Sequence, residues 1–222
     1  MAWTHYDLRD LAPMAAYSLL TGVVVPRPIA WVTTRAPDGV VNAAPFSYFG
    51  LLGSQPPILA FGPGDRPDGT PKDTARHITP GAHFVVNLVP YALVDRMNLT
   101  ATDFPPGASE PEVAGLDLEA GRHGPVPRLA ASPVALECRE HATLTIGHNR
   151  VVIGEVLGVT VRTDLLLDPA RGTVNTPALE LVGRMGGRGG YARAQDTFEL
   201  PRVRYADWLA AQAGQEQAGD EG

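Results

Sequence analysis

Two short segments, Asn42 to Ser47 and Lys72 to Thr74, have residue types that suit a phosphate. The first, NAAPFS, offers backbone N–H groups and a hydroxyl beside an aromatic ring, and the second, KDT, adds a cation and another hydroxyl. A phosphomonoester carries nearly two negative charges and several acceptor oxygens, so its site needs such donors. The sequence therefore predicts a flat, phosphorylated ligand bound through Ser47, Lys72 and Thr74. The alternative is that these are turn residues and that Asp73 only caps a short helix.

The glycine-rich run from Gly183 to Tyr191 superficially matches a dinucleotide-binding fingerprint. No buried strand is expected before it, and residues 191–198 would make a poor helix, so a Rossmann-type site is excluded. We interpret the run as a basic loop that ends in an aromatic side chain. The alternative is a solvated surface loop.

His148 stands at the mouth of a predicted strand. An imidazole there can donate to an electron-rich ring or a carboxamide, and it titrates near neutral pH. The alternative is an ordinary turn residue. Further along the same strand, Glu155 interrupts an apolar face, which predicts a structural ion pair or a subunit contact.

Several other kinds of site are excluded. The six histidines form no close-spaced pair of the kind that marks zinc sites, so no metal is expected. Neither Ser47 nor Ser54 lies in a nucleophile elbow. Cys138 is the single cysteine, so it cannot form an internal disulfide, and its place in an alternating strand predicts a core thiol.

Length and charge bound the function further. The 222 residues are enough for one sizeable domain, which we place at residues 1–211, followed by a disordered tail at 212–222. The net charge of -6 and the lack of a basic stripe argue against nucleic acid as a partner. No apolar run is long enough to span a bilayer and no leader is recognisable, so we expect a cytoplasmic protein with no membrane contact.

The elements that must position these residues are mostly strands. Apolar runs, alternation and turn signals predict strands at Ile29–Arg35, Val40–Ala43, Ile58–Phe61, His83–Val89, Leu136–Ile146 and Asn149–Thr163. Short helices are expected at Asp10–Leu20, capped by Asp10, and at Asp73–Ile78 and Tyr91–Met97. The stretch from Phe104 to Leu129 is dense in Pro, Gly and charge, which favours a long surface excursion. Many short strands with few helices indicate a closed antiparallel barrel.

Seven segments carry a resemblance to a known family. In chain order they are PRPIAWVTT (26–34), DGVVNAAPFSYF (38–49), PPILAF (56–61), KDTARHI (72–78), FVVNLV (84–89), GHNRVVIGEV (147–156) and RMGGRGGY (184–191). By their order and spacing the chain resembles the flavin reductase-like family of FMN-binding split-barrel proteins. That family includes flavoredoxin and the reductase components of two-component flavin monooxygenases.

The resemblance implies a mainly β fold, an antiparallel split β-barrel with a few short peripheral helices, in a homodimer with one FMN per subunit. It implies NADH or NADPH as electron donor, and an oxygenase or another protein as acceptor. Because the flavin carries the hydride chemistry in such enzymes, little acid–base machinery is needed.

The resemblance also implies roles for particular residues. The positions that match the family's isoalloxazine and ribityl loop are Thr33, Asn42, Ala43, Ala44, Phe46 and Ser47. The phosphate end matches Lys72, Asp73 and Thr74, and Arg184 and Tyr191 would close the site. His148 matches a histidine that faces flavin and nicotinamide in related reductases, and it is the one expected catalytic residue.

The chain departs from the family's common pattern in two places. A loop rich in Pro and Gly lies at Gly62–Gly69, and Asn149-Arg150 replaces a pair that is small or apolar in many relatives. Both departures bear on how a nicotinamide is used. The sequence therefore leaves two further hypotheses beside an NAD(P)H-dependent flavin reductase: a non-enzymatic FMN electron carrier of the flavoredoxin type, and a barrel for another flat ligand.

Overall fold

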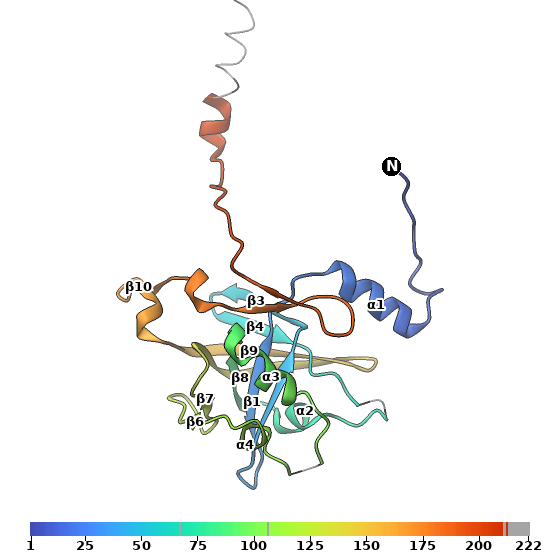
Figure 1. Cartoon of the computed structure of the whole chain (residues 1–222), viewed down its shortest axis with the longest axis vertical. Coiled ribbons are helices and arrows are strands. Elements are labelled where there is room, and N and C mark those ends of the chain that lie inside the picture. Colours follow the sequence, from blue (N-terminus) through green and yellow to red (C-terminus); the bar gives the residue numbers. More distant parts are fainter. Residues whose placement is uncertain (67, 106, 211, 213–222) are drawn as a thin grey trace, which may run out of the picture.

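A computed structural model describes residues 1–66, 68–105, 107–210 and 212 of the chain. Its main element is a seven-stranded antiparallel sheet in the order β2-β1-β5-β8-β9-β4-β3 (Figure 1). The strands are β1 (Ala30–Arg35), β2 (Val41–Phe46), β3 (Phe49–Ser54), β4 (Pro57–Phe61), β5 (His83–Asn87), β8 (Val134–Ile146) and β9 (Asn149–Val161). The prediction of a mainly β, antiparallel fold is confirmed.

Short helices and two-stranded ribbons surround the sheet. The helices are α1 (Pro13–Val23), α2 (Asp73–His77), α3 (Val94–Leu99) and α4 (Glu110–Val113), with 3₁₀ turns η1 (Tyr91–Leu93), η2 (Thr163–Leu165) and η3 (Pro177–Leu179). The ribbons pair β6 (Leu118–Glu119) with β7 (Arg128–Leu129), β10 (Leu166–Asp168) with β11 (Thr173–Val174), and β12 (Val182–Arg184) with β13 (Tyr191–Arg193). No helix in the described ranges is long and apolar enough to cross a membrane.

Strand β1 is buried on both faces, which explains why apolar and β-branched residues follow one another without alternation. Ala30 and Val32 belong to the cluster around Phe84, whereas Trp31 packs on the opposite face with Met97. The Trp31 indole donates to Thr100 Oγ1 at 2.9 Å, so its one polar group is satisfied in the core.

The long β8–β9 hairpin departs from simple alternation. Register shifts occur between Glu137 and Cys138 and between Glu140 and Ala142, so Glu137 and Cys138 are both buried although they are neighbours. The alternation expected along Leu136–Ile146 is therefore interrupted, because a bulge moves the following side chains to the other face. Glu155 forms an ion pair with Arg139 at 2.9 Å, which confirms the structural alternative for that residue.

Two other predictions need correction. Helix α1 begins at Pro13 after Ala12, with no side-chain cap, so Asp10 does not cap it. The described part of the Phe104–Leu129 stretch is not a surface excursion. It contains α4, β6 and β7, and Leu116 and Leu129 are buried in the same cluster as Trp31.

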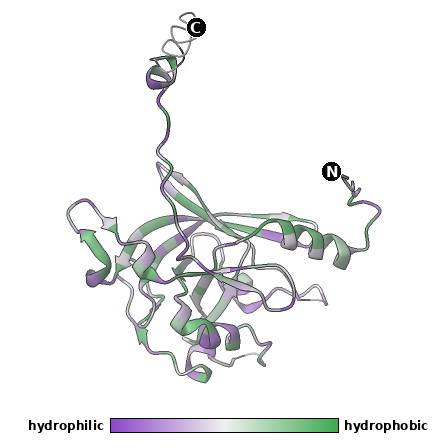
Figure 2. Ribbon diagram, turned by 45° about the horizontal axis from the view of Figure 1, so that its top comes forward, coloured by the Kyte–Doolittle hydropathy of each residue, from purple (hydrophilic) through white to green (hydrophobic). Residues whose placement is uncertain are grey.

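The end of the described chain leaves the sheet. Beyond β13, residues 194–210 are exposed and extend away from the body, with residues 205–210 helical (Figures 1 and 2). The tail predicted to be disordered, residues 212–222, lies outside the described residues except for Gln212, which is helical.

Candidate functional site

The Asn42–Ser47 segment is mostly strand. Strand β2 continues to Phe46, and only Ser47 and Tyr48 connect it to β3. The expected end of this strand at Ala43 is wrong, because Ala44 and Pro45 still pair with β1. Pro45 is tolerated because β2 is an edge strand, where a missing N–H breaks no ladder.

A cavity of about 680 Å³ opens beside this connection. Aromatic side chains from separate elements line it: Tyr17, Phe46, Tyr48, Phe49 and Phe61. The charged residues of its lining are Lys72 and Arg150, and no carboxylate lines it within the described part of the chain. An aromatic cavity with only cations among its charged groups suits a flat anionic ligand.

Tyr48 keeps its proton in this wall. Burial raises its pKa, and the nearby Tyr17 adds to the shift. The phenol is therefore neutral at physiological pH and remains a hydrogen-bond donor.

A second, smaller cavity of about 70 Å³ lies next to the first. Phe46 and Lys72 line both, so Lys72 stands where the two cavities adjoin. The smaller cavity is polar and takes most of the other predicted phosphate and loop residues: Asn42, Ala44, Asp73 and Thr74. The structure thus brings the two segments predicted from sequence to one place.

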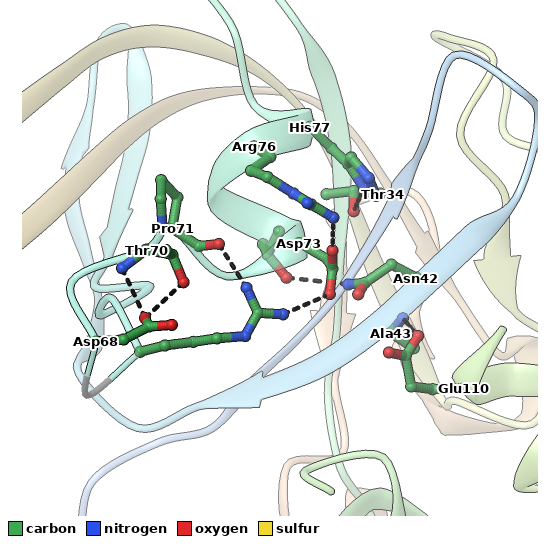
Figure 3. A network of polar contacts seen from close by, with 12 residues as sticks. Thr34, Asn42, Ala43, Asp68, Thr70, Pro71, Asp73, Arg76, His77 and Glu110 are labelled. Atoms are coloured by element: carbon green, nitrogen blue, oxygen red, sulfur yellow. Dashed lines mark hydrogen bonds and ion pairs between the residues drawn. The ribbon is translucent and has the colours of Figure 1, made fainter. Parts of the chain in front are cut away.

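Several donors in this region already have protein partners (Figure 3). Asn42 Nδ2 donates to Thr74 Oγ1 at 3.0 Å, and the Ala43 backbone N–H donates to Glu110 Oε2 at 3.1 Å. Burial raises the pKa of Glu110. The Thr74 hydroxyl accepts but has no acceptor of its own among the described residues, so its hydrogen is available to a ligand.

Asp73 is held by arginines and does not cap α2. It is the first residue of that helix, and Lys72 occupies the cap position without a side-chain hydrogen bond. Arg66 Nη2 pairs with Asp73 Oδ2 at 2.9 Å, and Arg76 contacts the other oxygen. The prediction of an Asp73 cap is wrong, because two guanidinium groups take its carboxylate. The Lys72 ammonium has no ion pair among the described residues.

His148 lies outside the large cavity. It is exposed in the turn between β8 and β9 and borders a separate hollow of about 370 Å³ with Asp65, Arg66, Asp68 and Gly69. The next two residues, Asn149 and Arg150, do line the large cavity. The described residues contain no group of three side chains placed to hold a metal.

Other predicted site residues lie away from both cavities. Thr33 is fully buried and donates to the Pro127 carbonyl at 2.7 Å. Arg184 lies over the Tyr191 ring, 4.9 Å from its centroid, and donates to the Gly190 carbonyl at 2.7 Å. Arg184 and Tyr191 pair across the β12–β13 ribbon and stabilise it.

Sequence reasoning missed Arg27, which connects three segments beside the large cavity by hydrogen bonds. It is buried and donates to Ser47 Oγ at 3.3 Å, to the Thr21 and Val24 carbonyls at 2.7 Å each, and to the Met185 carbonyl at 3.3 Å. The end of α1, the β2–β3 connection and the glycine-rich loop therefore share one guanidinium. Its place between two prolines was the available signal, since Pro28 restricts the backbone of Arg27 to an extended conformation.

Known proteins share this sequence pattern and this architecture. Residues 22–176 match the model of the flavin reductase like domain. A protein of Deinococcus radiodurans is 53% identical over all of this chain and 98% of its own length. Among solved structures, 2-nitrobenzoate 2-nitroreductase of Pseudomonas fluorescens is 33% identical with a TM-score of 0.82, covering 91% of this chain and 98% of that one. Nitrilotriacetate monooxygenase component B of Bacillus cereus is 29% identical with a TM-score of 0.85, covering 90% and 100%.

The antiparallel sheet and the structural matches define a split barrel of the flavin reductase type. The chain belongs to the flavin reductase-like domain family. Flavoredoxin of Desulfovibrio vulgaris, 22% identical with a TM-score of 0.68 over 82% of this chain and 93% of that one, shares the fold.

Proposed function

We propose that this protein is an NAD(P)H-dependent flavin reductase that uses FMN. The observation that carries the proposal is the 680 Å³ aromatic cavity whose charged lining residues are Lys72 and Arg150, joined at Lys72 to a small polar cavity. Bound FMN would supply the hydride and electron chemistry, and the protein would supply position and electrostatics.

The residues of the two cavities fit the ring and the phosphate of FMN separately. We assign the ring to the aromatic walls formed by Phe46, Tyr48 and Phe49, and the phosphate to Lys72 and the free Thr74 hydroxyl. A cation and a hydroxyl donor match the charge and acceptors of a phosphomonoester. Ser47, held by Arg27, adds a hydroxyl at the mouth of the larger cavity.

The remaining predicted residues take indirect roles in this proposal. Thr33 and Ala43 pack beneath the site, since neither lines a cavity and the Ala43 N–H is already bonded to Glu110. Arg184 and Tyr191 stiffen the ribbon that contacts Arg27 through Met185. His148 remains the proposed catalytic residue, in a position to act only from the edge of the site.

We include a homodimer in the proposal. Tyr17 and Leu52 line the large cavity although they are 52% and 59% exposed, and Leu51, next to Leu52 on edge strand β3, is 71% exposed. A second copy over this surface would bury apolar area and complete the cavity wall. We further propose a cytoplasmic location and an oxygenase or other protein as electron acceptor, for which the relative named as a monooxygenase component is support.

An anaerobic absorption experiment tests the function. The purified protein should show an FMN spectrum, or gain one on adding FMN, and should bleach on adding NADH or NADPH. A protein that stays yellow through dialysis but bleaches with neither donor would support the electron carrier of the flavoredoxin type instead. A protein that neither carries nor binds FMN would refute both.

A further inference from the structure

Arg150 is the second cation of the large cavity, and its surroundings differ from those of a structural arginine. It is the second residue of β9, directly after the turn that carries His148, and its side chain is 23% exposed. The tip of this hairpin lies on the same side of the molecule as α1 (Figure 1), and residues of both line the cavity.

Most hydrogen-bond donors of the Arg150 guanidinium have no partner among the described residues. Its one hydrogen bond among the described residues runs from Nη2 to Asp65 Oδ1 at 3.4 Å, near the upper limit for such a bond, and its buried Nε has no partner among them. A guanidinium has five donors. Arg27 in the same molecule gives four hydrogen bonds, so this fold can satisfy a buried arginine where the role is structural.

Asp65 holds Arg150 in place through one long ion pair. The adjacent Arg66 is anchored through Nη1 to the Pro71 carbonyl at 2.7 Å and through Nη2 to Asp73 at 2.9 Å. Asp65 is therefore fixed in position, with a side chain only 15% exposed. The arrangement presents a pre-positioned guanidinium with free donors at the cavity wall.

We propose that Arg150 binds a phosphate group of the nicotinamide dinucleotide that reduces the flavin. The inference rests on the proposed function, in which Lys72 takes the phosphate of FMN. Arg150 is then the cation left for a second anionic ligand in the same cavity. A planar guanidinium binds phosphate oxygens in pairs, which a nicotinamide dinucleotide offers at its diphosphate and, in NADPH, also at the 2′-phosphate.

Calorimetric titration of the FMN-saturated protein tests the site without turnover. The probes are ADP, which carries the diphosphate, and adenosine 2′,5′-bisphosphate, which carries the 2′-phosphate. In Arg150→Met we expect the Kd of the bound probe to rise at least tenfold, while the Kd of FMN changes less than twofold. Arg139→Met is the matched control, because Arg139 lies on the paired strand in an exposed ion pair with Glu155 and lines neither cavity.

A second variant keeps the test valid if Arg150→Met folds poorly. Asp65→Asn removes the competing carboxylate, so it should tighten binding of the same probe severalfold. Tighter binding of ADP would assign Arg150 to the diphosphate, and tighter binding of the bisphosphate would assign it to the 2′-phosphate.

Three results would overturn the inference: no binding of either probe to the wild type, an equal loss in Arg139→Met, or a matching loss of FMN affinity in Arg150→Met. A different result would separate the two proposals. If a probe binds through Arg150 but neither NADH nor NADPH reduces the flavin, the proposed reductase activity is refuted and the anion site at Arg150 is still supported.

Discussion

Replacing Lys72 by Met should separate recognition of the flavin's phosphate from recognition of its ring. Lys72 is half-buried between the two cavities and has no ion pair among the described residues, so its ammonium is free for a ligand. Met keeps the apolar stem and removes the charge. A hydrogen bond to a charged group contributes about 1.5–3 kcal/mol, which corresponds to a rise of about ten- to a hundredfold in the Kd of FMN.

Quenching of flavin fluorescence measures this effect with FMN and with riboflavin, which lacks the phosphate. The variant should bind riboflavin as the wild type does, and the wild type's advantage for FMN should shrink with added salt. Arg76→Met is the control, since Arg76 lies on the same helix, pairs with Asp73 and lines neither cavity. An equal loss for both flavins, or an unchanged Kd for FMN, would refute the assignment of Lys72 to the phosphate.

Three further predictions concern stability and reactivity. Burial raises the pKa of Glu110 above its unfolded value, so its contribution to stability is complete at low pH and is lost as pH rises through the folded pKa. Glu110→Gln should therefore raise Tm relative to the wild type more at neutral pH than at about pH 4, and a pH-independent difference would contradict this. Burial raises the pKa of the Cys138 thiol to about 12, so a thiol reagent should label it only in denaturant, and labelling of the native protein would count against the core position. A Cβ at Gly154 would clash with the Phe84 ring, so Gly154→Ala should cost about 1–3 kcal/mol in denaturant unfolding, whereas Gly22→Ala, with nothing within 4 Å, should not destabilise the fold.

The strands with strong local signals were predictable from sequence. Ile29–Arg35 is rich in β-branched and aromatic residues because β1 is buried on both faces, and the turn at residues 36–39 fixes where it ends. The structure also explains why strand β9 carries glycines at positions 154 and 158. Phe84 and His123 occupy the space that a side chain at these two positions would need.

Other elements depend on contacts that the local sequence does not encode. Strand β3 was not predicted, because its residues Leu51 and Leu52 are both largely exposed and follow no alternation between a buried and a solvent face. Helix α4 looked like part of a loop, because Pro111 and the glycines nearby read as turn residues. Its Glu110 is nevertheless buried against β2, where it accepts the Ala43 N–H.

The candidate site was predictable in its parts but not as an assembly. The residue types of Ser47, Lys72 and Thr74 indicated a phosphate, and the fold brings their two segments to adjoining cavities. Of the aromatic wall, Phe46 was predictable, whereas Tyr17 of α1 and Phe61 at the end of β4 were not, because only the tertiary fold brings them to the same cavity.

The net charge of the whole chain does not predict the charges that line a particular cavity. The net charge of -6 argued against nucleic acid, yet the charged residues that line the large aromatic cavity are both cations. The two cations differ from the structural arginines in their partners. Arg66 pairs with Asp73, and Arg27 donates to three carbonyls and a hydroxyl. Among the described residues, Lys72 has no ion pair and Arg150 has one long contact. A fold that satisfies its structural arginines fully has no structural need for an under-used pair of cations in an aromatic cavity. Their free donors are therefore best explained by anionic groups that arrive with ligands, one for each cation.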